Sequence, residues 1–481
     1  MSSDKDDLIN IIEEPLKPKK KIEENIKIKT SKKSVILVGI SILVIMIGLI
    51  IILYFIFNRN AGEQNYIKAK FLVKSKSEST IIFHPSFNDT IEKIKINGTQ
   101  LGKIDNKIIF KELGIAEVEL KFNKKMNNLD NFFCQCETLE EADLSYLFFD
   151  DISYMSDMFN GCKNLKKLTF GEFRPKNIFN ISNMFSGCEQ LEEIDIDNFI
   201  SDQLKDINGL FFNCSKLKEI NFGDLNTKNV VNMSKLFSGC ISLTSINFKD
   251  AKYFSTGNVS DMSYMFQNCK SLDNINLTKF NTTKTINMNN MFDSCEKVKR
   301  LEVNDFKTMN VQNMSHMFTN CYTLISLNLS NFDTNRVTNM CGMFKNCVNL
   351  NSLEINSFNT SLVSDMSEMF ENCQDLENLD ISNFDVKNVV KMSGMFENCF
   401  SLTSINLSNF ATENLIEASY FFHECLELNY MDLRKFNTLK LKNYEDFFQN
   451  KSDVVLIYNK TIFNLSIPED WNATDINPND D

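Results

Sequence analysis

Twelve of the 14 cysteines recur at a fixed spacing, and thiols are the side chains here with the widest chemistry. The step is 26 residues, apart from one step of 29 before Cys269. Such a series could hold metal ions, form disulfides or be buried as free thiols. The members of this cysteine ladder are Cys136, Cys162, Cys188, Cys214, Cys240, Cys269, Cys295, Cys321, Cys347, Cys373, Cys399 and Cys425.

The spacing favours buried free thiols. Metal binding is disfavoured because there is no Cys-x-x-Cys pair and the three histidines are scattered. Equivalent positions in a repeat point the same way, whereas a disulfide needs Cβ atoms that converge. We therefore predict that the ladder packs as small hydrophobic groups, with no metal and no cofactor. Cys341 stands where other repeats carry Ser315 and Ser367, so it is predicted to be exposed and is the candidate reactive or intermolecular thiol.

The fixed period predicts a stacked repeat architecture. In the unit around Cys321, apolar residues at i, i+3, i+4 and i+7, starting from Met314, predict a helix of about two turns. Leu327 and Leu329 then alternate with polar residues, which predicts a short strand. The fold class is therefore predicted to be an α/β repeat of about twelve coils, each with a short strand and a short helix.

The repeat resembles the BspA-like leucine-rich repeats, a 26-residue repeat family of bacterial surface proteins. The resemblance rests on Leu-x-x-Leu-x-Leu at 324–329, Ser-Asn-Phe-Asp-Thr at 330–334 and Asn-Met-Cys-Gly-Met-Phe at 339–344. It covers roughly 300 of the 481 residues. It implies a right-handed leucine-rich-repeat-like solenoid at a cell surface, used for adhesion or recognition.

An apolar segment without charges precedes the repeats, at 35–57. As a helix it would be about 35 Å long at 1.5 Å per residue, enough to cross a bilayer core of about 30 Å. Lysines cluster before it, so the positive-inside rule predicts a cytoplasmic N-terminus and extracellular repeats, a type II single-pass topology at the plasma membrane or cell surface.

Changes in composition predict five regions. The first is lysine-rich and has too few apolar residues for a core, and the third has short strand patterns that would cover the first coil. The regions are a disordered cytoplasmic tail at 1–34, the transmembrane helix at 35–57, a small β module and N-terminal cap at 62–130, the repeats at 132–438, and a C-terminal cap and loose tail at 439–481.

A column of polar residues is predicted to face outward from the strands. One interpretation is a polar, acidic, concave surface that binds a glycan, a cation or a basic protein face. The other is an asparagine ladder whose amides bond from coil to coil while the rest is solvated. This strand column comprises Thr169, Asp195, Asn221, Asn247, Asn276, Glu302, Asn328, Glu354, Asp380, Asn406 and Asp432.

Three sequons outside the repeat pattern, at Asn97, Asn464 and Asn472, are the glycosylation candidates. The net charge of −12 disfavours nucleic acid as a partner. Phosphate-binding loops, His-Glu-x-x-His and Gly-x-Ser-x-Gly are all absent from the sequence, so no enzymatic activity is predicted.

The sequence thus favours a surface protein whose solenoid binds or adheres to an extracellular protein, glycan or matrix. The alternative is a structural coat component without a specific ligand, which would show lateral self-association. A membrane-tethered hydrolase would require a catalytic dyad within 62–130.

Overall fold

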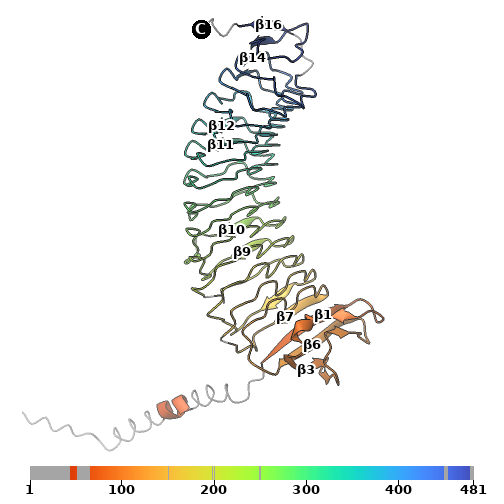
Figure 1. Ribbon diagram of the computed structural model, residues 1–481. Helices are drawn as coiled ribbons and strands as arrows, with labels where there is room; N and C mark the ends of the chain where they lie inside the picture. Colours follow the sequence, from red (N-terminus) through yellow and green to blue (C-terminus); the bar gives the residue numbers. More distant parts are fainter. Residues whose placement is uncertain are drawn as a thin grey trace, which may run out of the picture. The chain divides into compact units, whose positions relative to one another are not determined.

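The computed structural model describes residues 44–50, 65–149, 151–197, 199, 201–248, 251–448 and 453–476. The chain divides into two compact units, Met1–Glu63 and Gln64–Asp481. In the first unit, residues 44–50 are helical. The second unit is a stack of coils with a β-sheet at its N-terminal end (Figure 1).

The prediction of a membrane-spanning helix at 35–57 is corrected. No helix among the described residues is both long enough and apolar enough to cross a membrane. Only 44–50 of the segment is described, and a helix of that length spans about 10 Å. The remaining residues of 35–57 and the predicted tail at 1–34 lie outside the described residues.

The N-terminal part of the second unit is a six-stranded sheet with the order β4-β3-β6-β1-β7-β8. In β1 the even-numbered side chains Tyr66 to Leu72 point away from the core while Ile67, Ala69, Phe71 and Val73 are buried, as alternation in a half-buried strand requires. The strands are β1 Tyr66–Val73, β3 Ile91–Ile96, β4 Thr99–Gln100, β6 Gly114–Phe122, β7 Leu139–Asp143 and β8 Lys167–Thr169.

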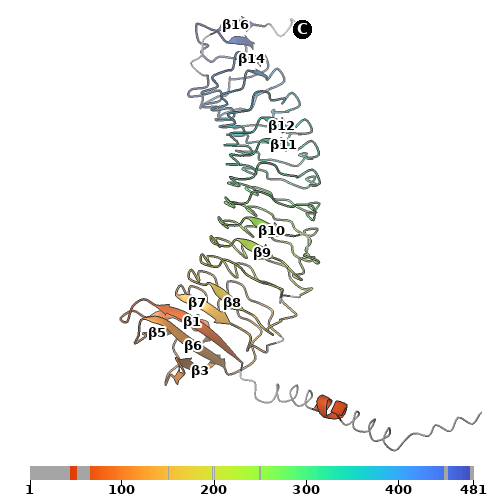
Figure 2. The same cartoon turned by 180° about the vertical axis from the view of Figure 1, so that it is seen from behind.

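Two of these strands belong to the first coils, so the sheet joins the module to the solenoid. Strand β1 pairs antiparallel with both β6 and β7, and β7 pairs in parallel with β8 of the next coil. The module also contains a separate antiparallel pair, β2 Thr80–Ile81 with β5 Lys107–Ile108. It is completed by the 3-10 helix η1 Pro85–Phe87. Figure 2 shows β1 and β6 lying directly against β7 and β8.

The coils carry short parallel strands on one side. Where neighbouring coils both carry a strand, the two pair in register about 26 residues apart, as Leu327 does with Leu353. The remaining strands are β9 Glu219–Asn221, β10 Ser245–Asn247, β11 Ser326–Asn328, β12 Ser352–Glu354, β13 Ser404–Asn406, β14 Tyr430–Leu433, β15 Val455–Tyr458 and β16 Asn472–Asp475.

The predicted short helix in each coil is wrong, and the fold is a β-solenoid of about twelve turns. A run of turns takes the helix's place. Alternate N–H groups bond to the next coil, for example Phe318 N to the carbonyl of Met343 at 3.0 Å, and those between bond three residues back, as Cys321 does to Phe318. An α-helix would use every N–H within its own segment. Bonds between coils therefore replace bonds along a helix.

Two residues with positive φ in each coil bend the chain through these turns. One stands directly before the ladder cysteine and the other four residues earlier, for example Asn320 at φ 57° and His316 at φ 55°. Asparagine or glycine fills nine of the twelve pre-cysteine positions, and both tolerate this conformation. These positions are Gln135, Gly161, Gly187, Asn213, Gly239, Asn268, Ser294, Asn320, Asn346, Asn372, Asn398 and Glu424.

The core of each coil combines a phenylalanine ring with a cysteine. All ladder cysteines are fully buried and free, which confirms the prediction of buried thiols. From Cys162 onward each Sγ–H donates to the carbonyl of the phenylalanine one coil earlier, as Cys321 does to Phe292 at 3.2 Å. The full set of donors is Cys162, Cys188, Cys214, Cys240, Cys269, Cys295, Cys321, Cys347, Cys373, Cys399 and Cys425.

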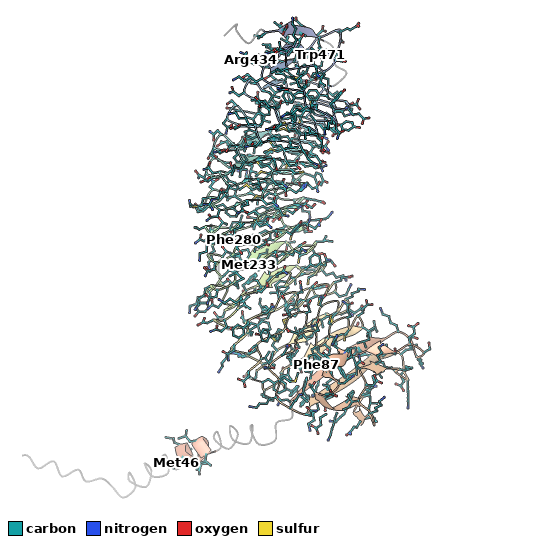
Figure 3. All side chains as sticks on the ribbon, in the orientation of Figure 1. Met46, Phe87, Met233, Phe280, Arg434 and Trp471 are labelled. Carbon is teal, nitrogen blue, oxygen red and sulfur yellow. The ribbon has the colours of Figure 1, made fainter. Side chains whose placement is uncertain are left out.

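Twelve phenylalanine rings stack along the solenoid with neighbouring centroids 5.4–6.0 Å apart. At this distance offset-stacked rings attract each other in addition to burying apolar area. Figure 3 shows other core side chains, Met233 and Phe280, inside the stack. The rings of this ladder are Phe133, Phe159, Phe185, Phe211, Phe237, Phe266, Phe292, Phe318, Phe344, Phe370, Phe396 and Phe422.

Both ends of the ring ladder meet an aromatic ring edge-on. Phe132 contacts Phe133 at 4.7 Å and 88°, and it packs against Phe87 of the module. At the other end Phe421 contacts Phe422 at 4.7 Å and 85°. Beyond it the aromatic cluster continues to Trp471, which Figure 3 places at the C-terminal end of the stack.

Candidate functional site

The strand column is exposed along the coils, but its side chains bond locally. In the coil of Asn328 the side-chain Oδ1 accepts the N–H of Ser330 at 2.9 Å, two residues on. Such a bond caps a turn within one coil and does not link coils. Seven members make this bond: Asp195, Asn221, Asn276, Asn328, Asp380, Asn406 and Asp432.

Among the members whose side chains are described, Glu302, Glu354 and Asp432 differ from Asn328 in their bonds or their exposure. Glu302 and Glu354 are exposed, and no bond of either side chain is found within the described residues. Asp432 is only 3% exposed and forms an ion pair with Arg434 at 2.7 Å. The side chain of Asn247 lies outside the described residues. The available polar surface of the column therefore ends before the last coil.

The predicted amide ladder exists, but at the pre-cysteine positions. Asn346 donates Nδ2–H to Oδ1 of Asn320 at 2.7 Å, and Asn372 donates in the same way to Asn346 at 2.7 Å. Asn320 in turn donates to Oδ1 of the buried Asp293 at 3.1 Å. Amide side chains of the pre-cysteine turns thus bond from coil to coil, whereas the side chains of the strand column do not.

A second polar column, which sequence analysis missed, lies directly before the segment predicted as the short helix of each coil. It forms twelve successive parallel bridges, from Asn128 to Asn443. Its members also cap turns: Oδ1 of Asn313 accepts the N–H of Ser315 at 3.0 Å. The signal was an asparagine or aspartate eight residues before nine of the twelve ladder cysteines. This bridge column comprises Asn128, Tyr154, Asn180, Asp206, Asn232, Asp261, Asn287, Asn313, Asn339, Asp365, Lys391, Glu417 and Asn443.

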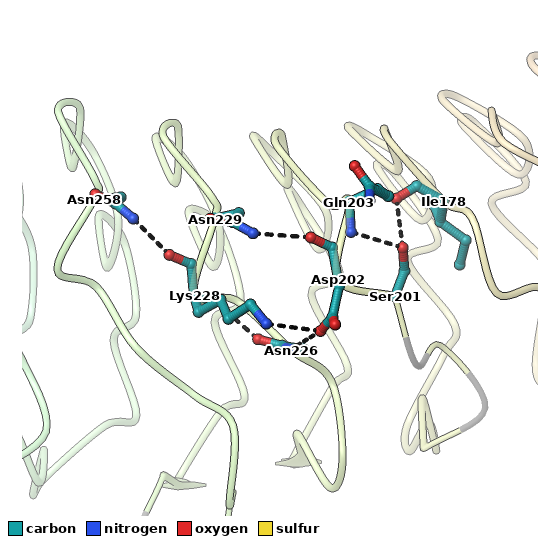
Figure 4. A network of polar contacts seen from close by, with 8 residues as sticks. All are labelled: Ile178, Ser201, Asp202, Gln203, Asn226, Lys228, Asn229 and Asn258. Atoms are coloured by element: carbon teal, nitrogen blue, oxygen red, sulfur yellow. Dashed lines mark hydrogen bonds and ion pairs between the residues drawn. The ribbon is translucent and has the colours of Figure 1, made fainter.

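Polar side chains also connect the coils along another edge (Figure 4). Asp202 accepts bonds from Asn226 at 2.6 Å and from Lys228 at 3.0 Å, both in the following coil. Asn229 donates to the backbone carbonyl of Asp202, and Asn258 repeats this contact one coil further on, to Lys228. These groups hold neighbouring coils in register and are occupied by that task.

A hollow of about 510 Å³ lies on the outward face of the six-stranded sheet. Strands β3, β6, β1, β7 and β8 all contribute to it. Its lining is mostly charged, which distinguishes it from the apolar pockets that hold drug-like ligands. The residues around this charged hollow are Lys68, Ala69, Lys70, Lys95, Gly98, Glu117, Val118, Glu119, Glu141, Ala142, Asp143, Lys167 and Thr169.

Some charges in the hollow are paired and others are available. Lys95 pairs with Glu119 at 2.6 Å, and Lys70 pairs with Glu141 at 2.8 Å. Lys167 and Glu117 are exposed, and neither side chain forms an ion pair within the described chain. A ligand could therefore engage Lys167 and Glu117 without breaking an existing ion pair.

Lys68 is held by two tyrosines. Its Nζ lies 4.6 Å from the ring centroid of Tyr146 and 5.5 Å from that of Tyr66, and these rings stack at 4.5 Å. Burial lowers the pKa of Lys68, but the neighbouring Tyr66 and Tyr146 hydroxyls raise it by more, so the net shift is upward. Lys68 therefore stays a cation in the hollow.

Strand pairing joins the charged hollow to the strand column. Thr169 lies in register with Asp143, Asp143 with Lys68, and Lys68 with Glu119. In the other direction Asp195 bridges to Asn221. A row of outward polar side chains, spaced about 4.8 Å apart, therefore runs from the module as far as Thr169 on β8.

Cys341 does not have the features of a reactive thiol. It is partly buried, contrary to the predicted exposure. Burial, reinforced by the carboxylates of Asp365 and Glu368, raises its pKa to about 12. Thiol reactivity requires the thiolate, so the environment disfavours it at neutral pH.

The three candidate acceptor asparagines lie at exposed positions. Asn97 is in the β3–β4 turn and its Oδ1 accepts the N–H of Glu117. Oδ1 of Asn464 accepts a bond from Thr438, and Asn472 begins β16. Their use as glycosylation sites stays a prediction.

The fold and its repeated contacts define a solenoid repeat protein. The model of the DUF285 family, described as "Mycoplasma protein of unknown function", matches residues 127–245, 241–353, 290–404 and 378–476. These overlapping stretches cover well over half of the 481 residues. The chain belongs to the DUF285 family. No curated protein matches it.

Solved structures with a similar chain course include leucine-rich-repeat receptors. A TLR13–ssRNA13 complex matches with a TM-score of 0.24 and 15% identity, over 66% of this chain and 46% of that one. The Toll–Spatzle complex of Drosophila matches with a TM-score of 0.19 and 14% identity, over 64% and 49%. This chain thus spans about half the length of these receptors.

Proposed function

We propose that this protein is a binding protein that recognises a polar protein or glycan ligand on its outward strand side, as a surface adhesion or recognition module. The charged hollow carries the proposal. It offers Lys68, Lys167 and Glu117 for contact, and the strand column extends it along the coils. A cell-surface location is supported only by the resemblance of the repeats to BspA-like surface repeats.

The different bonding of turn and strand side chains within each coil also supports a binding function. The turn residues bond to neighbouring coils through side chains as well as backbone, whereas the bonded side chains of the exposed column stay within their own coil. Substitutions on the strand side can therefore change a ligand contact without breaking the stack. This is the property that recognition surfaces need from a rigid scaffold.

The test is a panel of extracellular proteins, matrix components and glycans probed with the purified protein. Ligands found there are tested against two double variants, Lys68→Ala with Lys167→Ala, and Asn328→Ala with Asp380→Ala. The first should lower affinity at least about tenfold if each lysine contributes on the order of 1 kcal/mol. Lys216→Ala, an exposed lysine outside the hollow, is the control.

Two results would overturn the proposal. Binding that survives both double variants would place the contact elsewhere. A protein that binds nothing on the panel but assembles side to side would instead be the structural coat component. That the protein has no enzymatic activity stays a prediction.

A further inference from the structure

The two most exposed large apolar side chains among the described residues of the second unit, Ile109 and Leu113, lie on one loop of the module, with exposed Ile115 beside them. Ile109, Leu113 and Ile115 are 61%, 60% and 50% exposed. They lie within seven residues, on the β5–β6 loop and the start of β6. Phe110 between them is only 4% exposed and anchors the loop in the core. The neighbouring aliphatic side chains therefore point outward from a fixed base.

Strand register brings a lysine of another loop to the same place. Val73 pairs with Gly114, so Lys74 follows directly beside Leu113. Ile81 pairs with Lys107, which places that lysine at the start of the apolar loop. Figure 2 shows this end of β1, next to β5, at the margin of the sheet.

Lysines surround the apolar side chains and are not neutralised. Lys74, Lys107 and Lys111 are exposed, and none forms an ion pair with any described residue. Glu112 is the one acidic residue within 107–115. The loop patch, defined as Lys74, Lys107, Ile109, Lys111, Leu113 and Ile115, therefore combines outward aliphatic groups with a net positive charge.

We propose that the loop patch docks on an anionic lipid bilayer. Aliphatic side chains on a protruding loop can enter the acyl boundary while lysines remain among the phosphates. Each lysine near an anionic surface adds to the attraction, which salt then screens. A protein contact is less favoured because its centres are enriched in tryptophan, tyrosine and arginine, which the patch lacks.

This inference is independent of the charged hollow. It uses only residues of the module, and it does not require a spanning helix. The hollow lies around Lys68 and Glu119 in the middle of the strands, whereas the patch lies where β1 ends and β6 begins. A ligand could therefore occupy the hollow while the patch contacts lipid.

The experiment uses residues 64–481, which form one compact unit containing every buried core residue of the solenoid and module. This choice removes the apolar segment 35–57 from the assay, and circular dichroism with thermal unfolding verifies the fold of each variant. Vesicles of phosphatidylcholine with one third phosphatidylglycerol are sedimented with the protein, beside pure phosphatidylcholine vesicles. We expect binding to the anionic vesicles that weakens as salt rises.

Two double variants separate the contribution of apolar burial to vesicle binding from that of lysine charge. Ile109→Ser with Leu113→Ser should weaken binding at least about tenfold through lost apolar burial. Lys107→Gln with Lys111→Gln should weaken it and flatten the salt dependence. Leu439→Ser is the matched control, because Leu439 is 57% exposed but lies far along the chain.

The outcomes decide the proposal in either direction. The proposal is overturned if the unmodified protein does not bind anionic vesicles. It is also overturned if both double variants bind these vesicles as well as the unmodified protein does. If the serine variant instead abolishes self-association seen by gel filtration, the patch is a contact between copies and the lipid proposal fails. These results leave binding by the charged hollow untouched, so the two proposals can fail separately.

Discussion

The two sides of each coil differ in what their polar groups do. On the turn edge, which runs from the bridge column to the ladder cysteine, N–H groups, thiols and amides bond to the adjacent coil, and the bridges continue without a gap from Asn128 to Asn443. On the strand side most strands are three residues long, and those from β9 to β12 pair only in twos. The turn edge therefore holds the stack at every coil, the polar contacts around Asp202 add to it on a further edge, and the strand side chains are left as a surface.

Asparagine shows the difference most clearly. Asn346 uses its amide to bond both neighbouring coils, whereas Asn406 bonds only the N–H of Ser408 in its own turn. The residue type is the same, but its place in the coil decides between holding the stack and shaping the surface. Variants at the two places should therefore have different costs.

The largest effect is expected from removing a ring of the phenylalanine ladder. Phe318→Ala leaves a gap between Phe292 and Phe344 and should lower the free energy of unfolding by about 3–5 kcal/mol. Chemical denaturation measures it. The control is Ile325→Ala on the strand side, where the side chain is 39% exposed and the loss should be under about 1 kcal/mol. Similar losses at both sites would contradict the comparison.

A middle effect is expected at the amide ladder. Asn346→Ala removes two side-chain bonds and places alanine at φ 60°, so the loss of stability should be about 1–3 kcal/mol. Asn346→Gly tolerates that φ but cannot restore the amide bonds. Glycine should therefore recover only part of the loss in a denaturation curve, and full recovery would show that the amides contribute nothing.

A small effect is expected in the strand column. Asn328→Ala loses the acceptor for Ser330 and should cost about 0.5–1 kcal/mol. Asn328→Asp retains an acceptor oxygen and should stay close to the wild-type melting temperature. If the alanine variant cost as much as Asn346→Ala, the strand side would also be holding the coils together.

The smallest effect concerns a carboxyl in the bridge column. Burial raises the pKa of Asp206 despite the bonds from Asn208 and Asn232. Because the pKa of Asp206 is higher in the folded than in the unfolded protein, protonation of this carboxyl stabilises the fold. This stabilisation is present below about pH 4 and is lost as the pH rises through the folded-state pKa.

Asp206→Asn should therefore raise the melting temperature at pH 7, and this gain should vanish near pH 3. Asn180 and Asn232 occupy the equivalent positions in the adjacent coils, so the amide fits. Thermal unfolding at both pH values measures it, and an equal shift at the two would exclude the carboxyl charge as the cause.

The repeat, the number of coils and the buried thiols could be predicted because a 26-residue period, with one step of 29, links twelve of the 14 cysteines. The helix could not be excluded in the same way. Met314, Met317, Phe318 and Cys321 are buried in both a helix and a turn series, so apolar periodicity alone does not separate them. The missed signal was backbone conformation: Asn or Gly before most of the cysteines, and Gly at 342 and 394.

The candidate site was harder to predict. The strand column could be found from its alternation with Leu327 and Leu329, but its turn-capping role depends on a backbone N–H two residues away. The charged hollow depends on β1 pairing between β6 and β7, segments more than 40 residues apart on one side and more than 60 on the other. Local sequence patterns carry no information on that pairing.

The edge-on rings at Phe132 and Phe421 have an evolutionary consequence. Every interior coil offers its neighbours the same thiol, carbonyl and ring, so gene duplication or loss of one whole unit would leave matching faces at the joint. Only the terminal rings differ, and they lie outside the interchangeable segment. The length of the solenoid can therefore change between lineages by whole coils, while the module and the closing strands remain unchanged.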